Sequence, residues 1–242
     1  IRMAGSRIPK TKAMVITNSS TGPDQISVLY ADPDFLSGFV IKSAATGSSS
    51  SITVETQNGG AFEPNIKYYR KNIILVKKDG SCSVIRKITA ASGTGTQRAF
   101  TLTNSPASTV FGDSQADVSA TYTDQYAYIV SAITYSISSS TLYVNTNTGG
   151  TNQPLSENTD DLQIAYLDKN GSWYCYDSSH TSAPTTIADI RAARINIITR
   201  TAIADPDFTG QRPSLEDHAA GGSDHYRRRV LTSMIKIRNM GF

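Results

Sequence analysis

Long apolar runs and long helical repeats are the features that this 242-residue sequence most clearly lacks. No run reaches the roughly 18 consecutive apolar residues that a membrane-spanning helix needs, and no secretory leader opens the chain, which begins IRMAG. Short runs rich in Val, Ile, Thr and Tyr are broken instead by Gly, Asn, Asp and Pro. This pattern is typical of antiparallel strands and predicts a strongly β-rich fold.

Cysteine and histidine are scarce, with two and three residues respectively. The cysteines, Cys82 and Cys175, belong to no CxxC pair, and the histidines complete no zinc-binding pattern. Two alternatives remain for the cysteines. They are either two free thiols or the partners of one long-range disulfide, formed in an oxidising compartment.

Catalytic signatures are missing as well. His180, His218 and His225 lie in polar, loop-like contexts, and none belongs to a GxSxG-type motif. The glycine patterns that cradle phosphates are absent. The scattered acids do not exclude a glycosidase pair, but the chain has a single Trp where sugar clefts often show more aromatics. Nothing in the sequence indicates an enzyme, and we expect none.

Clustered positive charge is also missing, although the net charge is +3. Lys and Arg are absent from residues 99–168, so the tyrosines there lack the basic neighbours of a nucleic-acid platform. Arg227, Arg228 and Arg229 are consecutive, but successive side chains of a strand point to opposite faces. We therefore expect neutralised charges at a strand end rather than one basic patch, with upstream acids as partners: Glu216, Asp217 and Asp224.

What the sequence does contain is abundant serine and threonine, 30 and 27 residues, which favour turns and strands. Asp79-Gly80 and Asn170-Gly171 are strong hairpin signals, and a further turn is expected near Ser138–Ser140. The expected strands are Gln25–Ala31, Phe39–Lys42, Ser51–Thr56, Asn72–Lys77, Cys82–Ala90, Ala99–Thr103, Tyr126–Ser136, Thr141–Asn145, Asp161–Leu167, Trp173–Tyr176, Ile190–Thr201 and Tyr226–Arg238.

Helix signals are confined to two short segments. Ile1–Ala4, followed by Gly5, reads as the end of a helix whose body is missing, and Thr185–Asp189 as a single turn. The stretch Tyr68–Thr123 reads as a group of strands of its own, a small barrel-like β-rich insertion. Low-complexity loops are expected at Ala44–Ser51 and Thr146–Gln153.

A near-repeat, ADPDF, occurs at residues 31–35 and 204–208. We expect each copy to form an exposed Asp-Pro turn, because two carboxylates alone seldom hold a metal. The alternative is a calcium site at the second copy, with five acids as its candidate ligands: Asp205, Asp207, Glu216, Asp217 and Asp224.

An ordered set of short motifs in the C-terminal part resembles the PilW-type minor pilins, type IV pilus assembly proteins with a prepilin-type N-terminus. The matching positions are Tyr135, Leu142-Tyr143, Glu157-Asn158, Asp161-Leu162-Gln163, Tyr166-Leu167-Asp168, Asn170-Gly171, Ile190-Arg191, Arg200-Thr201, Arg228-Arg229 and Arg238-Asn239. The resemblance covers residues 1–5 and about 126–239. It departs at Val144, where the family carries a basic residue.

The resemblance implies an α+β pilin-like head over residues 1–242, with its long N-terminal helix truncated after residues 1–5 and a family-like antiparallel sheet over 126–242. Alternation in the last strand places Leu231, Ile235 and Ile237 on its core face. The family implies a precursor anchored in the inner membrane by the missing helix, with a periplasmic head that later joins the extracellular pilus.

The same resemblance implies a structural subunit that primes pilus assembly near the tip through contacts with other minor pilins and the major pilin. It implies no cofactor. One alternative is a minor pseudopilin of a type II secretion system, which shares the fold. Another is a tip module that binds a glycan or DNA through the loop at Ala204–Ser223 and the basic end of the chain. A secreted β-rich hydrolase is the least supported.

Overall fold

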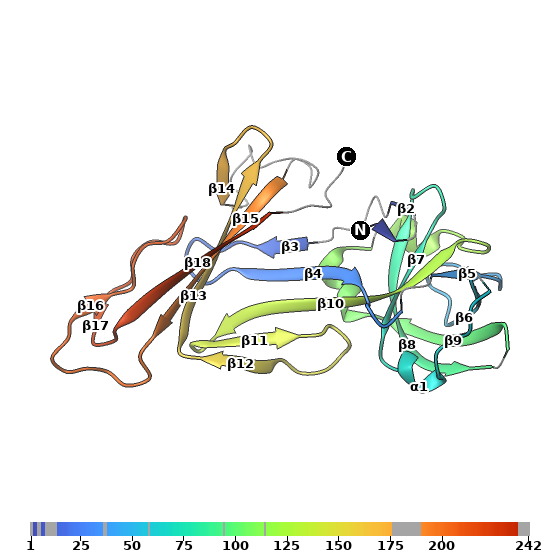
Figure 1. Ribbon diagram of the computed structural model, residues 1–242, viewed down its shortest axis with the longest axis horizontal. Coiled ribbons are helices and arrows are strands. Elements are labelled where there is room, and N and C mark those ends of the chain that lie inside the picture. Colours follow the sequence, from blue (N-terminus) through green and yellow to red (C-terminus); the bar gives the residue numbers. More distant parts are fainter. Residues whose placement is uncertain are drawn as a thin grey trace. The chain divides into compact units, whose positions relative to one another are not determined.

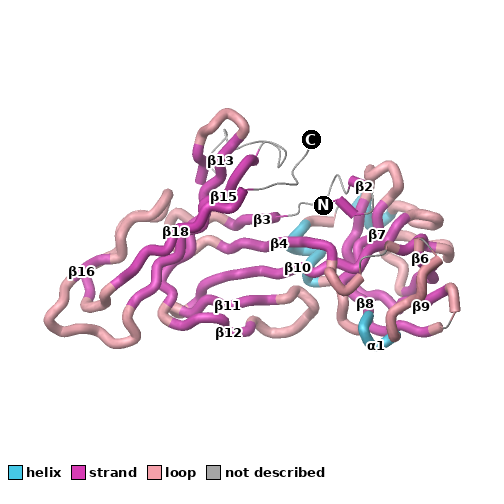
Figure 2. Tube along the Cα trace, viewed as in Figure 1, coloured by secondary structure: helices cyan, strands magenta, loops and turns pink. Residues whose placement is uncertain are grey.

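The computed structural model of the chain is rich in strands and contains three short helices within the part it describes (Figure 1). Helices, strands and loops are distinguished along the trace in Figure 2. The described residues are 2–3, 6–7, 14–35, 38–57, 59–93, 95–113, 115–175 and 190–236.

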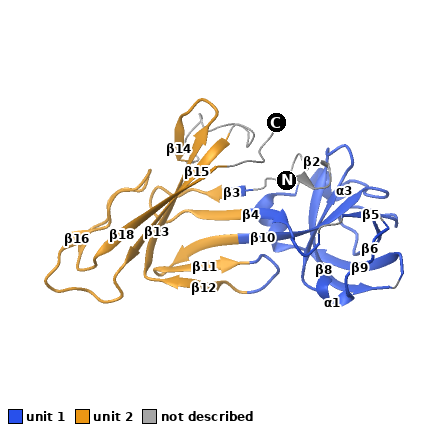
Figure 3. Cartoon of the chain, in the orientation of Figure 1, with its two compact units in different colours: residues 1–15, 28–133, 146–150 blue, residues 16–27, 134–145, 151–242 orange. Residues whose placement is uncertain are grey.

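The chain divides into two compact units (Figure 3). Unit 1 comprises residues 1–15, 28–133 and 146–150, and unit 2 comprises residues 16–27, 134–145 and 151–242. The strands β4 (Gln25–Ala31) and β10 (Tyr126–Ser138) contribute residues to both units.

Unit 1 is built around a closed ring of six antiparallel strands. In order around the ring these are β10, β5 (Phe39–Ile41), β6 (Ser51–Thr56), β9 (Gln97–Asn104), β8 (Ser83–Ser92) and β7 (Asn72–Val76). The ring closes because β10 pairs with β5 through Tyr126 and Ala127 and also pairs with β7 over its first five residues. These six strands therefore form a closed antiparallel barrel.

The ring extends beyond Tyr68–Thr123, since β5 and β6 precede that interval and β10 follows it. The core inside the ring also combines residues from the interval Tyr68–Thr123 with residues outside it. Phe39 packs against Phe100, with ring centroids 5.8 Å apart, and Tyr68 packs against Phe100 at 5.0 Å. The boundaries of an insertion at Tyr68–Thr123 stay a prediction.

Alternation along β10 supplies two cores in unit 1. Ala127 and Ile129 join the cluster inside the ring, whereas Tyr128 and Val130 join a second cluster on its outer side. The helix α2 (Pro106–Phe111) contributes to this outer cluster, which explains why a barrel strand can be apolar on both faces.

The short helices were not expected from the sequence. They are α1 (Asn65–Tyr68), α2 and α3 (Gln115–Ser119). Ser105 caps the N-terminus of α2, where its Oγ accepts a hydrogen bond from the Ala107 amide at 3.1 Å, and Gly112 caps the C-terminus with φ of 77°. These are standard start and stop signals, but they enclose fewer than two turns.

The N-terminal segment differs from the helix end that we expected. Arg2–Met3 forms β1, paired antiparallel with β2 (Ser6–Arg7), so these two residues adopt strand geometry. The strand β3 (Met14–Thr17) follows and pairs with β4. The helical turn expected at Thr185–Asp189 lies outside the described residues.

Unit 2 holds a second antiparallel sheet of four strands. Their order is β14 (Trp173–Cys175), β13 (Thr159–Asp168), β15 (Ile190–Arg200) and β18 (Arg228–Lys236). The hairpin partners β11 (Thr141–Asn145) and β12 (Gln153–Glu157) extend from β10, and β16 (Gly210–Gln211) pairs with β17 (Ser223–Asp224).

The predicted turns join the predicted strands. Gly80 and Gly171 adopt φ of 69° and 86° in the β7–β8 and β13–β14 connections. Between β10 and β11, Ser139 and Ser140 adopt φ of 48° and 55°, directly after the Ser138–Thr141 pair. Two successive residues of positive φ match the twist of a two-residue hairpin.

The last strand, β18, corrects one expectation. Leu231 and Ile235 were expected in the core, but their side chains are 47% and 48% exposed. The prediction was wrong because β18 is the edge of its sheet, and the described chain covers neither of its faces at these positions. Ile237 lies outside the described residues.

Candidate functional site

The outer edge of β18 is an open strand. β18 pairs with β15 from Arg228↔Arg200 to Lys236↔Ala192, and within the described chain no strand pairs with its other side. Both of its faces carry exposed apolar side chains. Val230 and Met234, 40% and 64% exposed, lie on one face, and Leu231 and Ile235 lie on the other. We call the exposed strand Arg229–Lys236 the β18 edge.

The three arginines at the start of β18 have different environments. The Arg228 side chain is 8% exposed. Its Nε donates to Asp160 Oδ2 at 2.6 Å, and its Nη1 donates to Asp224 Oδ1 at 2.6 Å. These bonds raise the pKa of Arg228 and hold the pKa of Asp224 well below its usual range. Arg227 pairs with Asp205 at 2.8 Å, whereas Arg229 is exposed.

The expected neutralisation is thus present for Arg227 and Arg228, with Asp224 as one of the predicted partners. The other two predicted partners bind residues outside this group of arginines. The Glu216 carboxylate accepts hydrogen bonds from Arg194 Nε at 2.8 Å and Arg194 Nη2 at 2.9 Å. The Asp217 carboxylate accepts a hydrogen bond from Asn18 Nδ2 at 2.7 Å.

The loop between β16 and β17 is tied to the sheet by buried polar groups. Asp161, fully buried on β13, accepts from Arg212 Nη1 at 2.9 Å, and its Oδ2 lies 2.8 Å from His218 Nδ1. Gln163 donates to Asp161 Oδ1 at 3.0 Å, and Asn196 donates to Glu216 Oε1 at 2.6 Å. These bonds hold the loop on a polar face of the sheet.

Asp24 belongs to the same region of unit 2. Its carboxylate accepts the Ser19 and Ile164 amides, each at 2.8 Å. Burial raises its pKa to about 7, with smaller contributions from the negative charges of Asp217 and Asp161. Asp24 is therefore a neutral or half-ionised anchor near neutral pH.

An Asp–His pair suggests a catalytic base, but the nearby thiol does not complete a nucleophilic site. The Cys175 thiol donates to Glu216 Oε2 at 3.6 Å. Burial, together with the Glu216 and Asp217 charges, raises the pKa of Cys175 to about 12. A nucleophilic cysteine needs the opposite shift. What the structure shows for Asp161 and His218 is that their contact, together with Arg212, joins the loop to β13.

The acids proposed as calcium ligands have separate contacts. Asp205, Glu216 and Asp224 each pair with a different arginine, and the Asp205 carboxylate also accepts the Asp207 amide at 3.1 Å. Among the described residues, no group of three or more His, Cys, Asp or Glu side chains is placed to hold a metal ion. The calcium site stays a prediction.

The cysteines lie in different units, Cys82 in unit 1 and Cys175 in unit 2, and both are free thiols in this structure. The disulfide alternative therefore has no support here and stays a prediction.

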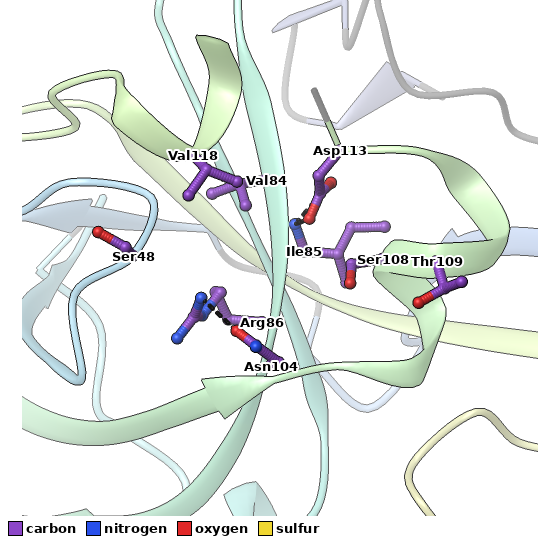
Figure 4. A pocket seen from close by; sticks show the side chains of 9 residues that line it. All are labelled: Ser48, Val84, Ile85, Arg86, Asn104, Ser108, Thr109, Asp113 and Val118. Carbon is purple, nitrogen blue, oxygen red and sulfur yellow. Dashed lines mark hydrogen bonds between the residues drawn. The ribbon is translucent and has the colours of Figure 1, made fainter. Parts of the chain in front are cut away.

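Unit 1 contains a pocket of about 440 Å³ that sequence reasoning missed (Figure 4). It lies where β9 ends: Arg86↔Asn104 is the last β8–β9 pair, and beyond it the chain turns into α2. Along the next part of β8, the Ile85 amide donates to both carboxylate oxygens of Asp113, each at 3.2 Å. The lining residues are Ser48, Val84, Ile85, Arg86, Asn104, Ser108, Thr109, Asp113 and Val118.

Two charged groups define this pocket. Arg86 is 7% exposed and donates from Nη1 to Asn104 Oδ1 at 2.8 Å, while its buried Nε has no acceptor among the residues that the structure describes. Burial raises the pKa of Asp113 to about 7, assisted by the charge of Asp117. The sequence contained a signal for this site, because Arg86 interrupts the apolar face formed by Val84 and Ile88.

The remaining family-motif positions are divided between core and surface. Leu162, Tyr166 and Ile190 are buried like Asp161, Gly171 forms a turn at positive φ, and Tyr135, Leu142, Arg191 and Arg200 are half-buried. Arg200 Nε lies 3.3 Å from Asp160 Oδ1. Arg238 and Asn239 lie outside the described residues.

Comparison with known proteins gives one family. A sequence model described as type IV pilus-assembly protein W matches residues 113–239, which include the four-stranded sheet. Among curated proteins, none matches the chain. A solved type IV-like pilin from Thermus thermophilus is 12% identical, with 70% of this chain and 84% of that chain covered and a TM-score of 0.32.

Proposed function

Because the chain belongs to the type IV pilus-assembly protein W family, we propose that it is the head of a minor pilin that primes pilus assembly and sits near the pilus tip. The family places the protein in the cell envelope or the pilus and indicates a structural rather than an enzymatic role. Among the residues that the structure describes, no helix is long and apolar enough to cross a membrane. Anchoring in the inner membrane is part of the proposal.

The observation that carries the proposal is the β18 edge, which lies within the family-matched residues. An open strand offers a row of backbone donors and acceptors, and proteins that do not use such an edge usually shield it. Here it carries exposed apolar side chains on both faces instead. We assign it to contact with a neighbouring pilin subunit, either another minor pilin or the major pilin.

A charge on this edge tests the proposal. Ile235→Asp would be introduced on the chromosome of the source organism, and pili would be counted by electron microscopy. We expect a loss of pili comparable to deletion of the gene, together with lost co-purification of other minor pilins, because a carboxylate on an apolar contact is costly to desolvate. The matched control is Ile203→Asp, since Ile203 is 81% exposed but lies in the loop after β15 and not on β18.

Normal piliation in the deletion strain would overturn the proposal. Normal piliation with lost type II secretion would assign the chain to the pseudopilin alternative instead. If deletion abolishes pili while Ile235→Asp does not, the β18 edge is not the contact.

A further inference from the structure

Arg86 is a buried cation whose polar partners are incomplete. The guanidinium has five N–H donors, but its one hydrogen bond in the structure is the bond from Nη1 to Asn104. It forms no direct ion pair with a carboxylate of the described chain. Burial lowers its pKa, and the nearby Asp113 charge acts in the opposite direction without reversing the shift. Burying an unpaired charge is costly. No carboxylate of the described residues bonds directly to this guanidinium, so an anion that enters the pocket can pair with it.

We propose that the pocket around Arg86 binds a small hydroxylated carboxylate, a sugar acid, whose carboxylate pairs with the Arg86 guanidinium. The planar fork of an arginine matches a carboxylate with two parallel hydrogen bonds. A volume of about 440 Å³ is within the ordinary range of small-molecule sites.

The surrounding groups select the class of anion. Asp113 lines the pocket, and Asp117 lies close enough to influence its ionisation, so a doubly charged phosphate would be repelled more strongly than a singly charged carboxylate. A ligand with one negative charge, such as a carboxylate, therefore fits the pocket better than a phosphate. The exposed rim residues Ser48, Asn104 and Thr109 offer hydroxyl and amide groups that suit a ligand carrying several hydroxyls.

Calorimetry on the full 242-residue chain tests the site with glucuronate as the probe. Glucose, which lacks the carboxylate, is the matched ligand control, and N-acetylglycine represents a peptide C-terminus. We expect heat from glucuronate and none above dilution from glucose. Arg86→Gln should weaken glucuronate binding about tenfold or more, because it removes the charge-assisted pair. Arg98→Gln changes an arginine of β9 outside the pocket and should leave the affinity unchanged.

Asp113→Asn provides a readout that does not depend on the stability of the Arg86 variant. The charged groups that influence Asp113 are Arg86 on β8 and Asp117 on α3. In the unmodified chain, binding should weaken as the pH rises through 7 and Asp113 ionises; in Asp113→Asn this loss should disappear.

No glucuronate heat at millimolar ligand, or equal binding of glucose, would overturn the proposal. Binding of N-acetylglycine without glucuronate would overturn the assignment to a sugar acid. Because piliation is not measured, these results are independent of the proposed pilus role.

Discussion

Arg228 is the residue on which the start of β18 most depends. Its side chain is 8% exposed, as is that of Asp160, and the two are joined at 2.6 Å. Arg228→Gln would leave Asp160 buried with only Arg200, at 3.3 Å, as its cationic partner. We expect a loss of about 3 kcal/mol in the free energy of unfolding, which is typical of removing one partner of a buried ion pair.

Urea unfolding of Arg228→Gln and Arg229→Gln provides the comparison. Arg229 is the next residue of the same strand but is exposed, so its replacement should change the free energy of unfolding by less than about 0.5 kcal/mol. Equal losses in the two variants would show that the ion pairs of Arg228 do not stabilise the sheet.

Asp113 makes the stability of unit 1 depend on pH. In the folded chain its carboxyl keeps its proton until about pH 7, because burial raises its pKa from 3.8. The unfolded carboxyl ionises near 3.8, so between these values the unfolded chain binds fewer protons. This group therefore lowers the free energy of unfolding as the pH rises from 4 to 7.

Asp113→Asn should remove this contribution while its side-chain oxygen still accepts the Ile85 amide. The variant should gain stability relative to the unmodified chain between pH 4 and 7, and the gain should level off above pH 7. Thermal unfolding at several pH values measures it. A difference that does not change with pH would contradict the raised pKa.

At the scale of elements, local patterns predicted most strands but not which strand was an edge. The bounds of β4, β6 and β11 match the predicted ones, because apolar alternation and turn residues are encoded locally. β3 and β12 were missed, and the expected loop Thr146–Gln153 ends where β12 begins. Whether Leu231 and Ile235 are covered depends on distant parts of the chain, which alternation within one strand does not encode.

The exposure of β18 gives a stability prediction opposite to that for a core strand. Ile235→Asp should change the free energy of unfolding by less than about 0.5 kcal/mol, because Ile235 is 48% exposed at the sheet edge. Ile198→Asp, on the neighbouring strand β15, should unfold the sheet, because Ile198 is fully buried. Circular dichroism melts of both variants measure this, and a large loss in Ile235→Asp would place β18 in a covered core.

The β10–β11 turn can be improved. Ser139 and Ser140 both adopt positive φ, which costs a residue other than Gly or Asn about 1 kcal/mol. Replacing them with Asn-Gly, the preferred pair of this turn, should raise the free energy of unfolding by about 1 kcal/mol. The control is Thr141→Gly, just after the turn in β11, which should lower the free energy of unfolding. If the Asn-Gly replacement and Thr141→Gly both raised it, the assigned turn would be contradicted.

At the scale of the whole molecule, the sequence pointed to a β-rich fold and to the family but not to the pocket or to the hydrogen bonds that hold the loop between β16 and β17 on the sheet. Arg86, Asp113 and Asp161 gain their roles from strands and loops that are distant in the chain, and spacing gives no sign of such contacts. In the loop at Ala204–Ser223, Arg212 and His218 bind the buried carboxylate of Asp161.

The interval Tyr68–Thr123, predicted as an insertion, can be tested by excision. The core inside the barrel combines Ile73 and Phe100 from this interval with Phe39, Ile52 and Ile129 from outside it. Replacing the interval with a short Gly-Ser linker would therefore expose apolar side chains that stay behind, each contributing about 2 kcal/mol when buried. We expect unit 1 to lose its slowly exchanging amides in hydrogen-exchange mass spectrometry, while β13 and β15 in unit 2 keep theirs, because they pair with each other along nearly their full length. Retained protection in β5 and β6 after excision would show that the rest of unit 1 folds without the interval, as an insertion requires.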